Sequence, residues 1–245
     1  MDELGGTVGT WCSLTDPAVA ELAAGGDVDF VVVDTEHAPL GLATVADCLR
    51  GVAANDCAPV VRVPWNDPVR IKRLLDLGPD GLIVPMVDDA DGARAAVAAT
   101  RYPPEGVRGI AAARAADYGR RFESYVESGH RELSLLVQVE SEAAVEHAAD
   151  IAAVDGVDAL FVGPADLSAA LGCFADWEAP SFLAAVETVL EAGEAAGVPV
   201  GTLGTTPEEV RSLGALGFDF LVAGFDAAHL VAGQRRTVGA AEDVL

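Results

Sequence analysis

The sequence is short of lysine, of aromatic residues and of paired cysteines. Lys72 is the only lysine among 15 basic residues, which face 39 acidic residues and leave a net charge of −24. Because the acids are spread along the chain, they predict a solvated surface that repels nucleic acid and anionic membranes. A GC-rich genome would explain arginine in place of lysine, but not the excess of acid. We therefore expect a halophilic protein, working in concentrated salt that screens charge repulsion.

The cysteine pattern argues against a zinc ribbon or a thioredoxin-like site. Cys12, Cys48, Cys57 and Cys173 form no Cys-x-x-Cys pair, so we expect scattered, buried free thiols in a reducing compartment. No basic segment followed by an apolar one opens the chain, and no apolar run reaches membrane-spanning length. These features predict a cytoplasmic protein without a membrane partner.

Short apolar runs alternate with longer amphipathic segments along the whole chain, with Gly or Pro at the joints. Expected strands cover residues 7–12, 30–35, 59–64, 81–86, 134–140, 159–163, 199–203 and 220–224. Expected helices cover residues 17–24, 41–53, 68–77, 90–100, 143–153, 181–196 and 207–216. This alternation predicts an α/β fold, a single (β/α)₈ TIM barrel over residues 1–245. An open doubly wound sheet is the alternative, although no Gly-x-Gly-x-x-Gly follows a strand to bind NAD.

One connection, residues 101–132, is unusually long and contains an expected helix near 122–128. Loops of this length are often functional or form subunit contacts.

Polar side chains follow several apolar strands where a barrel gathers its chemistry, at the carboxyl ends. The fifth strand carries Gln138 and Glu140 on one face, and the sixth leads through a Gly-Pro turn into Asp166. Two carboxylates at adjacent strand ends, with water completing the shell, suit Mg²⁺ or Mn²⁺. The alternative is that each carboxylate caps the helix that follows it.

His37 lies just past the end of the second expected strand, and Arg62 lies within the third. Asp34 lies three residues before His37, an arrangement that can orient an imidazole and raise its basicity. Arg62 interrupts a β-branched run, so its guanidinium must meet an anion or carbonyl oxygens. An internal ion pair with Asp34 or Glu36 is the alternative. The other histidines, in helix-like surroundings, are interpreted as surface or packing residues: His130, His147 and His229.

These segments together resemble the class II pyruvate aldolases of the HpcH/HpaI family, which cleave 4-hydroxy-2-oxo acids. The resemblance covers nearly the whole chain, from Gly9-Thr-Trp11 to the last strand. It rests most strongly on the segments Asp34-Thr-Glu-His37-Ala-Pro, Val61-Arg-Val-Pro-Trp-Asn-Asp-Pro68, Leu82-Ile-Val-Pro-Met-Val87, Arg101-Tyr-Pro-Pro-Glu-Gly-Val-Arg-Gly109, Val137-Gln-Val-Glu140 and Phe161-Val-Gly-Pro-Ala-Asp-Leu-Ser168.

The resemblance implies that Glu140 and Asp166 bind a divalent cation, which is Mg²⁺, Mn²⁺ or Co²⁺. It implies further that the pyruvyl group of a 2-oxo acid is held at this cation, helped by Gln138 and by the backbone around Ala165 and Asp166. No pyridoxal phosphate is implied.

The resemblance also assigns the remaining catalytic roles. Arg62 would stabilise the charge on the keto oxygen. His37, paired with Asp34, would act as the base, and Asp76 matches a second acid that raises its basicity. A Schiff-base mechanism needs a lysine at a strand end, whereas Lys72 lies in a segment with helical spacing.

Members of this family are usually hexamers with exchanged C-terminal elements, so the resemblance predicts a homo-hexamer acting on a 2-oxo acid and an aldehyde. Other interpretations stay open. A lyase acting on acyl-CoA hydroxy acids would need a basic CoA-binding surface, and this chain offers few basic residues. A 2-keto-3-deoxy sugar acid aldolase and a non-catalytic keto-acid sensor are the others.

Overall fold

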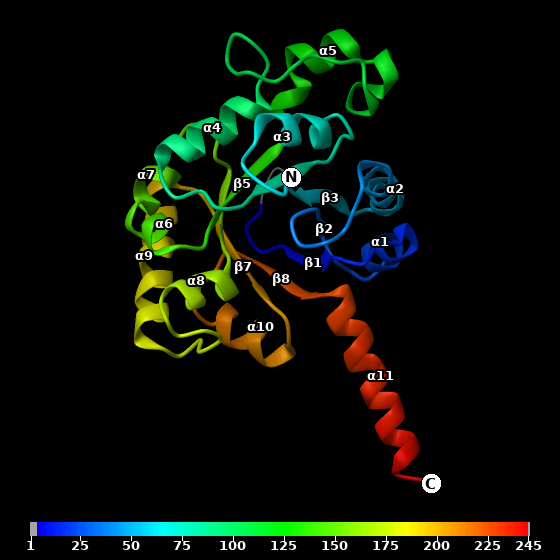
Figure 1. Cartoon of the computed structure of the whole chain (residues 1–245), viewed down its shortest axis with the longest axis vertical. Coiled ribbons are helices and arrows are strands. Elements are labelled where there is room, and N and C mark those ends of the chain that lie inside the picture. The colour runs from blue at the N-terminus through cyan, green and yellow to red at the C-terminus, as the bar shows by residue number, and fades with distance from the viewer. Residues whose placement is uncertain (1–3, 245) are drawn as a thin grey trace.

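Eight parallel strands close into one barrel in the computed structural model, which describes residues 4–244 (Figure 1). The first strand pairs with the last, Val8 opposite Leu221, so the sheet is closed. The predicted TIM barrel is therefore confirmed, and the open doubly wound sheet is wrong. The strands are β1 (Val8–Cys12), β2 (Phe30–Asp34), β3 (Ala58–Arg62), β4 (Gly81–Val84), β5 (Ser134–Val139), β6 (Ala159–Val162), β7 (Val200–Gly204) and β8 (Phe220–Phe225).

Helices surround the barrel, and several begin at the caps that the sequence provides. Asp16 accepts a hydrogen bond from the backbone N–H of Ala18, and Thr206 forms a capping box with Glu209, which satisfies N–H groups that lack a helical partner. The helices are α1 (Pro17–Ala24), α2 (Leu42–Ala53), α3 (Pro68–Leu75), α4 (Ala90–Thr100), α5 (Phe122–Glu127), α6 (Glu142–Glu146), α7 (Ala148–Ala152), α8 (Pro164–Ala170), α9 (Pro180–Ala196), α10 (Pro207–Gly214) and α11 (Asp226–Glu242), with 3₁₀ turns η1 (Arg114–Gly119) and η2 (Gly129–Arg131).

Three helical features differ from the sequence prediction. The expected helix 143–153 is divided into α6 and α7 at His147, where φ is −103° and ψ is 10°. Helix α8 follows the Gly-Pro step that the sequence suggested as a turn, because proline is favourable at the first helical position. Helix α11 was not expected, and Asp226 is its only buried residue among those described.

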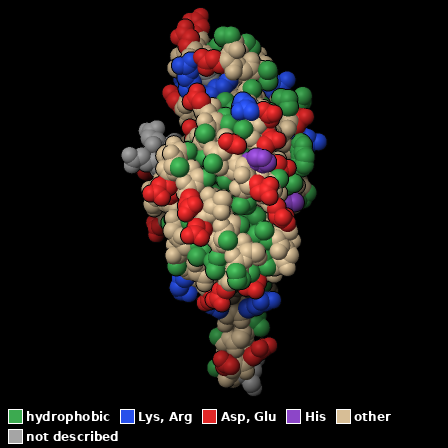
Figure 2. Space-filling model, turned by 90° about the vertical axis from the view of Figure 1, so that its left-hand side faces the viewer, with side chains coloured by type: hydrophobic (Ala, Val, Ile, Leu, Met, Phe, Trp, Pro, Cys, Tyr) green, Lys and Arg blue, Asp and Glu red, His purple; other side chains and the backbone are tan. Residues whose placement is uncertain are grey.

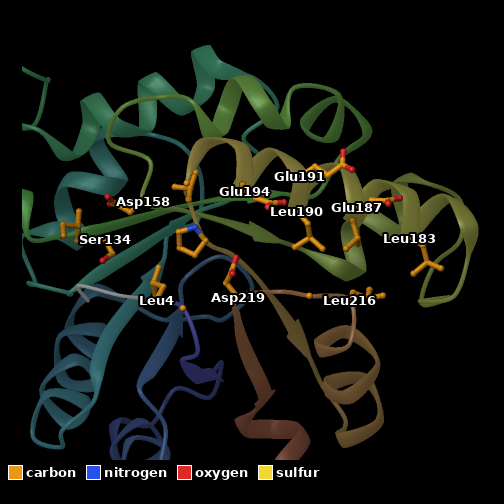
Figure 3. Close-up of a pocket in the computed structure, with 18 of the residues that line it drawn as sticks. Leu4, Ser134, Asp158, Leu183, Glu187, Leu190, Glu191, Glu194, Leu216 and Asp219 are labelled. Carbon is orange, nitrogen blue, oxygen red and sulfur yellow. The ribbon is translucent and has the colours of Figure 1, made fainter.

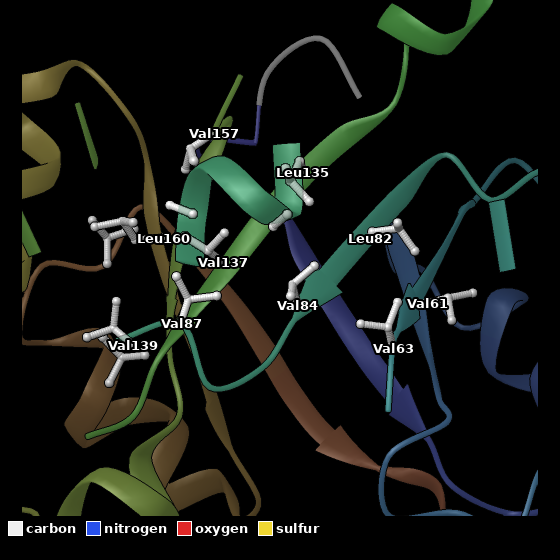
Figure 4. Close-up of a cluster of buried hydrophobic side chains, with 14 of the residues drawn as sticks. Val61, Val63, Leu82, Val84, Val87, Leu135, Val137, Val139, Val157 and Leu160 are labelled. Carbon is white, nitrogen blue, oxygen red and sulfur yellow. The ribbon is translucent and has the colours of Figure 1, made fainter. Parts of the chain in front are cut away.

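Apolar side chains form two cores, one on each side of the barrel wall. The outer core lies between strands and helices and includes Val61, Leu82 and Val137 (Figure 4). The inner core fills the barrel with Leu4, Trp11, Phe30, Val32, Val60, Ile83, Leu136, Ala159, Phe161, Phe220 and Val222. The inner core fills the middle of the barrel, and enzymes with this fold carry their chemistry at the carboxyl ends of the strands.

Aspartates tie neighbouring strands together at the opposite, amino ends. Asp29, Asp158 and Asp219 each precede an even-numbered strand. Each accepts, at 2.7–2.8 Å, the first or second backbone N–H of the strand before it. Asp80 holds the same position before β4, but the residue opposite it is Pro59, which has no N–H to donate. Three of these four carboxylates therefore stabilise strand pairing directly.

A buried arginine, Arg108, helps to attach the long segment 101–132 to the end of α3. The Arg108 guanidinium carbon lies 4.8 Å from the ring centre of Tyr102 and 5.6 Å from that of Tyr125. Its Nη2 atom is 3.4 Å from the Asp76 carboxylate, and Arg108 is 2% exposed. The segment is also attached at η1, where the backbone N–H of Ala115 donates to the Asp76 carbonyl and Arg114 donates to the Leu77 carbonyl, whereas α5 buries none of its residues.

The surface and the thiols agree with the sequence prediction. Acidic side chains are scattered over the face shown in Figure 2 and form no single patch there. Cys12, Cys48 and Cys57 are buried and Cys173 is half-buried, all as free thiols. Across residues 4–244, none of the helices is both long enough and apolar enough to span a membrane.

Candidate active site

A layer of polar side chains covers the carboxyl end of the inner core. Strand β2 ends at Asp34 and β3 at Arg62, and these two residues are directly opposite in the register. Strand β5 contributes Gln138 near its end, and Glu140 is the first residue after the strand. Both side chains are buried. Asp166 lies in the first turn of α8, directly after β6. The barrel topology thus brings together polar groups that are more than 130 residues apart in the sequence.

Arg62 is the centre of this layer. Its Nε and Nη2 atoms donate to the two oxygens of Asp34 at 2.9 and 2.7 Å. Its Nη1 atom lies 2.9 Å from Glu36, close but poorly aligned for a hydrogen bond. The guanidinium carbon also lies 4.7 Å from the ring centre of Trp11. The internal ion pair considered from the sequence is therefore present, and it fixes the plane of the guanidinium.

The two carboxylates around Arg62 differ in their ionisation. Burial opposes the charge on Asp34, but the hydrogen bonds and charge of Arg62 hold its pKa below the usual value. Burial raises the pKa of Glu36, although Arg62 opposes this shift. Asp34 is thus the firm counter-ion of the arginine, and Glu36 is the weaker one.

Glu140 is a buried carboxylate held by two neutral donors. The backbone N–H of Met86 donates to Oε1 at 2.8 Å, and the amide Nε2 of Gln138 donates to Oε2. A side chain at Gly163 would not fit, because a Cβ atom there would lie 2.7 Å from Glu140 Oε2 and 2.8 Å from Gln138 Nε2. The Oε1 atom of Gln138 is buried without a hydrogen-bond partner. The carboxylate is fixed, and the amide beside it retains an unused acceptor.

The pKa of Glu140 is raised to about 7, chiefly by burial and further by the negative charges of Asp166 and Glu36, against the Met86 hydrogen bond and the charge of Arg62. Asp166 therefore lies close enough to Glu140 for the two charges to repel each other. Such a pair favours either a proton or a cation. No group of three or more His, Cys, Asp or Glu side chains suited to a metal occurs within residues 4–244, so a cation here would need water or substrate oxygens to complete its shell.

His37 lies at the edge of the layer with an exposed imidazole. Its side chain is 68% exposed, and Nε2 lies 4.0 Å from the Glu36 carboxylate. Asp34 accepts from the backbone N–H of His37 at 3.5 Å, while its carboxylate is paired with Arg62. The expected pairing of Asp34 with the imidazole is therefore replaced by a backbone contact, because the guanidinium occupies both oxygens.

Asp76 and Ala165 are the remaining predicted site residues. Ala165 lies in the first turn of α8 beside Asp166. Asp76 ends α3, about 12 Å along the helix from its start near the strand ends. Its ion pair in the described chain is with Arg108. One chain therefore brings together all the predicted site residues except Asp76.

The capping alternative does not hold for the site carboxylates. Ser141, and not Glu140, caps α6 by accepting from Ala144, and Gly163 occupies the cap position of α8. The interpretation of two further histidines is confirmed: His147 bonds to the carbonyl of Ala143 and His229 to that of Ala223. The side chain of His130 lies outside the described part of the structure.

A hollow of about 1290 Å³ lies at the other end of the barrel, as Figure 3 shows. Its walls include Leu190 and Glu191 of α9, together with Ser134, Asp158 and Asp219 at the starts of strands. Two of these aspartates hold backbone N–H groups, as described above. The hollow therefore lies among strand-tying residues, away from the polar layer.

A closed parallel barrel with carboxylates, an arginine and an amide at its carboxyl ends defines an enzyme with one site at that face. The family described as HpcH/HpaI aldolase/citrate lyase matches residues 7–232, and the chain belongs to this family of carbon–carbon lyases.

Several relatives are similar over most of their length. The chain is 42% identical to a 4-hydroxy-2-oxo-heptane-1,7-dioate aldolase of Salmonella arizonae over 227 residues, 92% of this chain and 86% of that protein. An HpcH/HpaI aldolase/citrate lyase family protein from Burkholderia cenocepacia has a TM-score of 0.93 at 37% identity, covering 98% of this chain and 96% of the other. An HpcH/HpaI aldolase from Desulfitobacterium hafniense has a TM-score of 0.87 at 27% identity, covering 98% and 93%.

Proposed function

We propose that this protein is a metal-dependent class II aldolase that reversibly cleaves the C3–C4 bond of a 4-hydroxy-2-oxo acid to pyruvate and an aldehyde. The observation that carries the proposal is Glu140, a carboxylate buried beside Asp166 without a cationic partner of its own. The similarity to named aldolases supports the same reaction class.

The residues present fit a divalent cation. Glu140 and Asp166 offer carboxylate oxygens, and their mutual repulsion is relieved by positive charge. The unpartnered Oε1 atom of Gln138 adds a further buried acceptor next to them. Oxygen donors of this kind suit Mg²⁺ or Mn²⁺, and Co²⁺ is a third candidate. When bound, such a cation supplies Lewis-acid stabilisation of the charge on the substrate's keto oxygen.

The chain's own residues then have separate tasks. Arg62, held in plane by Asp34, offers its positive charge to the keto oxygen as the C3–C4 electron pair moves into an enolate. Gln138 and the backbone at Ala165 and Asp166 orient the pyruvyl group. The exposed imidazole of His37 accepts the proton of the C4 hydroxyl, so that an aldehyde is released. A proton delivered to C3 of the enolate completes pyruvate.

The proposed role of Asp76 requires a second copy of the chain. Within one chain, Asp76 lies at the far end of α3 beside Arg108. For its carboxylate to support an imidazole, as the family resemblance suggests, it must belong to a neighbouring subunit.

Helix α11 supports assembly into an oligomer, for which we propose the hexamer of the family. The helix projects from the barrel in Figure 1. It is anchored at Asp226, which accepts from the backbone N–H groups of Ser13 and Leu14. Beyond this anchor it exposes Leu230 at 66% and Val238 at 48%. An extended helix with exposed apolar side chains is stabilised when another subunit covers them.

We also propose that residues 1–245 form one domain and that the protein works in a salt-rich cytoplasm. The nearly lysine-free acidic composition supports high salt, and the four free thiols suit a reducing compartment.

The test is pyruvate release from 4-hydroxy-2-oxo acids in high-salt buffer, with Mg²⁺ or Mn²⁺ and then with EDTA. We expect metal-dependent release that is lost in Glu140→Ala and retained in Glu142→Ala, an exposed position on α6. Absence of release in a folded protein that binds metal would contradict the aldolase assignment. In that case acyl-CoA hydroxy acids are the next substrates to test.

A further inference from the structure

Met86 adopts a backbone conformation that is rare for its residue type. It follows β4 and Pro85 at the carboxyl end of the barrel, and its φ angle is +54°. Residues with a Cβ atom enter this left-handed region at a cost in free energy, and glycine is the usual residue there. The other non-glycine residues with positive φ in the described chain lie in loops or turns: Asp27, Asp117, Tyr118 and Ala175.

The conformation of Met86 has one consequence at the site, since it directs the backbone N–H to Glu140 Oε1 at 2.8 Å. The other oxygen, Oε2, accepts from Gln138. Each oxygen of the carboxylate therefore has one fixed donor and retains lone pairs for another partner. Backbone strain that persists at such a place is typical of a group held ready for function.

We propose that Met86 is a positioning residue, whose left-handed backbone aims its N–H at Glu140 and so fixes the orientation of the metal-binding carboxylate. This inference rests on the proposed function, because it takes Glu140 as a metal ligand. The backbone carries the effect, so the identity of the side chain should matter only through its tolerance of positive φ.

Substitutions at Met86 separate backbone from side-chain effects. Ile has a similar volume but is β-branched and resists positive φ, whereas Leu has a similar volume without the branch and is the matched control. Asn and Gly tolerate positive φ while removing the apolar side chain. We expect Met86→Ile to weaken Mn²⁺ binding by roughly 10- to 100-fold, the usual effect of losing a group that orients a metal ligand. Met86→Leu, Met86→Asn and Met86→Gly should stay within about threefold of the wild type on the same argument.

The measurement is the loss of the free-Mn²⁺ electron paramagnetic resonance signal on titration of metal-free protein in high salt, with near-ultraviolet circular dichroism to confirm folding. Equal affinities of the Ile and Leu variants would overturn the proposal. A Gly or Asn variant that binds Mn²⁺ tenfold or more weakly than the wild type would also overturn it. The Gly and Asn variants test the proposal even when the Ile variant does not fold. A wild-type protein that binds no Mn²⁺ would defeat the proposed function itself, whereas normal wild-type binding with four equivalent variants defeats only this inference.

Discussion

Metal-free Glu140→Gln protein is expected to be more stable than the wild type near pH 8, because ionising a buried carboxylate is costly. The pKa of Glu140 rises from 4.5 to about 7 on folding, chiefly through burial. At 1.36 kcal/mol per pH unit, this shift corresponds to about 3 kcal/mol of free energy of unfolding. Gln at this position can still accept from Met86, and its N–H can meet the unpartnered Oε1 of Gln138 when that amide turns over.

The sign of the pH dependence follows from which state releases its proton first. Below about pH 4.5 the carboxyl is protonated in both the folded and the unfolded chain, so it contributes nothing to the pH dependence. Between the two pKa values the unfolded chain ionises first, and the wild-type free energy of unfolding falls as pH rises. Above the folded pKa, near 7, the loss is complete. The advantage of the Gln variant should therefore grow between pH 5 and 7 and then remain constant.

Urea unfolding with EDTA in high salt, at one protein concentration from pH 5 to 8.5, measures this difference. The exposed Glu142→Gln variant is the control and should follow the wild type at every pH. Adding Mn²⁺ at about 100 times its dissociation constant should stabilise the wild type by about 2.7 kcal/mol and cancel most of the variant's advantage. Parallel pH profiles of wild type and Glu140→Gln without metal would refute the reasoning.

Four further substitutions test other contacts. Asp34→Ala leaves the Arg62 guanidinium buried without its main partner, so it should lower the free energy of unfolding in urea by about 3–5 kcal/mol. A decrease of less than about 1 kcal/mol would contradict this expectation. Gly163→Ala crowds the site carboxylate and should weaken Mn²⁺ binding by roughly 10- to 100-fold by calorimetry, whereas an unchanged affinity would contradict it. Asp158→Ala removes the acceptor of a strand N–H and should lower the free energy of unfolding by about 1–2 kcal/mol. Asp80→Ala removes no such acceptor, because Asp80 faces Pro59, and should lower it by less than about 0.5 kcal/mol. Equal decreases would refute the role of these aspartates in strand pairing.

The barrel was predictable because each strand is an apolar run bounded by Gly, Pro or polar residues. Strand ends shifted by one or two residues, as in β3, which ends at Arg62 and not at residue 64. The division of the 143–153 helix at His147 was not predictable, because its apolar spacing continues across the break. Helix α11 was missed because its apolar residues are exposed, so they lack the one-sided pattern that packing against a barrel produces.

The polar side chains that meet at the strand ends were predictable, apart from Asp76, but their pairing was not. Asp34 was assigned to His37, its neighbour in sequence, whereas the β2–β3 register places Arg62 directly opposite. The contribution of Met86 depends on a φ angle of +54°, and no sequence pattern marks a methionine for that conformation. Likewise, the sequence suggests that Gly163 belongs to a turn. The pairing of β5 with β6 shows its other role, which is to leave space for the Glu140 carboxylate.

The two ends of this barrel use carboxylates in opposite ways. At the amino ends, aspartates such as Asp158 accept backbone N–H groups of the adjacent strand, so their charge is used within the sheet. At the carboxyl ends, Glu140 accepts one backbone N–H and one amide N–H within the described chain, and the charges of Asp166 and Glu36 raise its pKa. Its ionised form is costly in the chain alone, and positive charge from a ligand would remove that cost. The same chemical group, a carboxylate, therefore stabilises one end of the barrel and prepares the other end to bind.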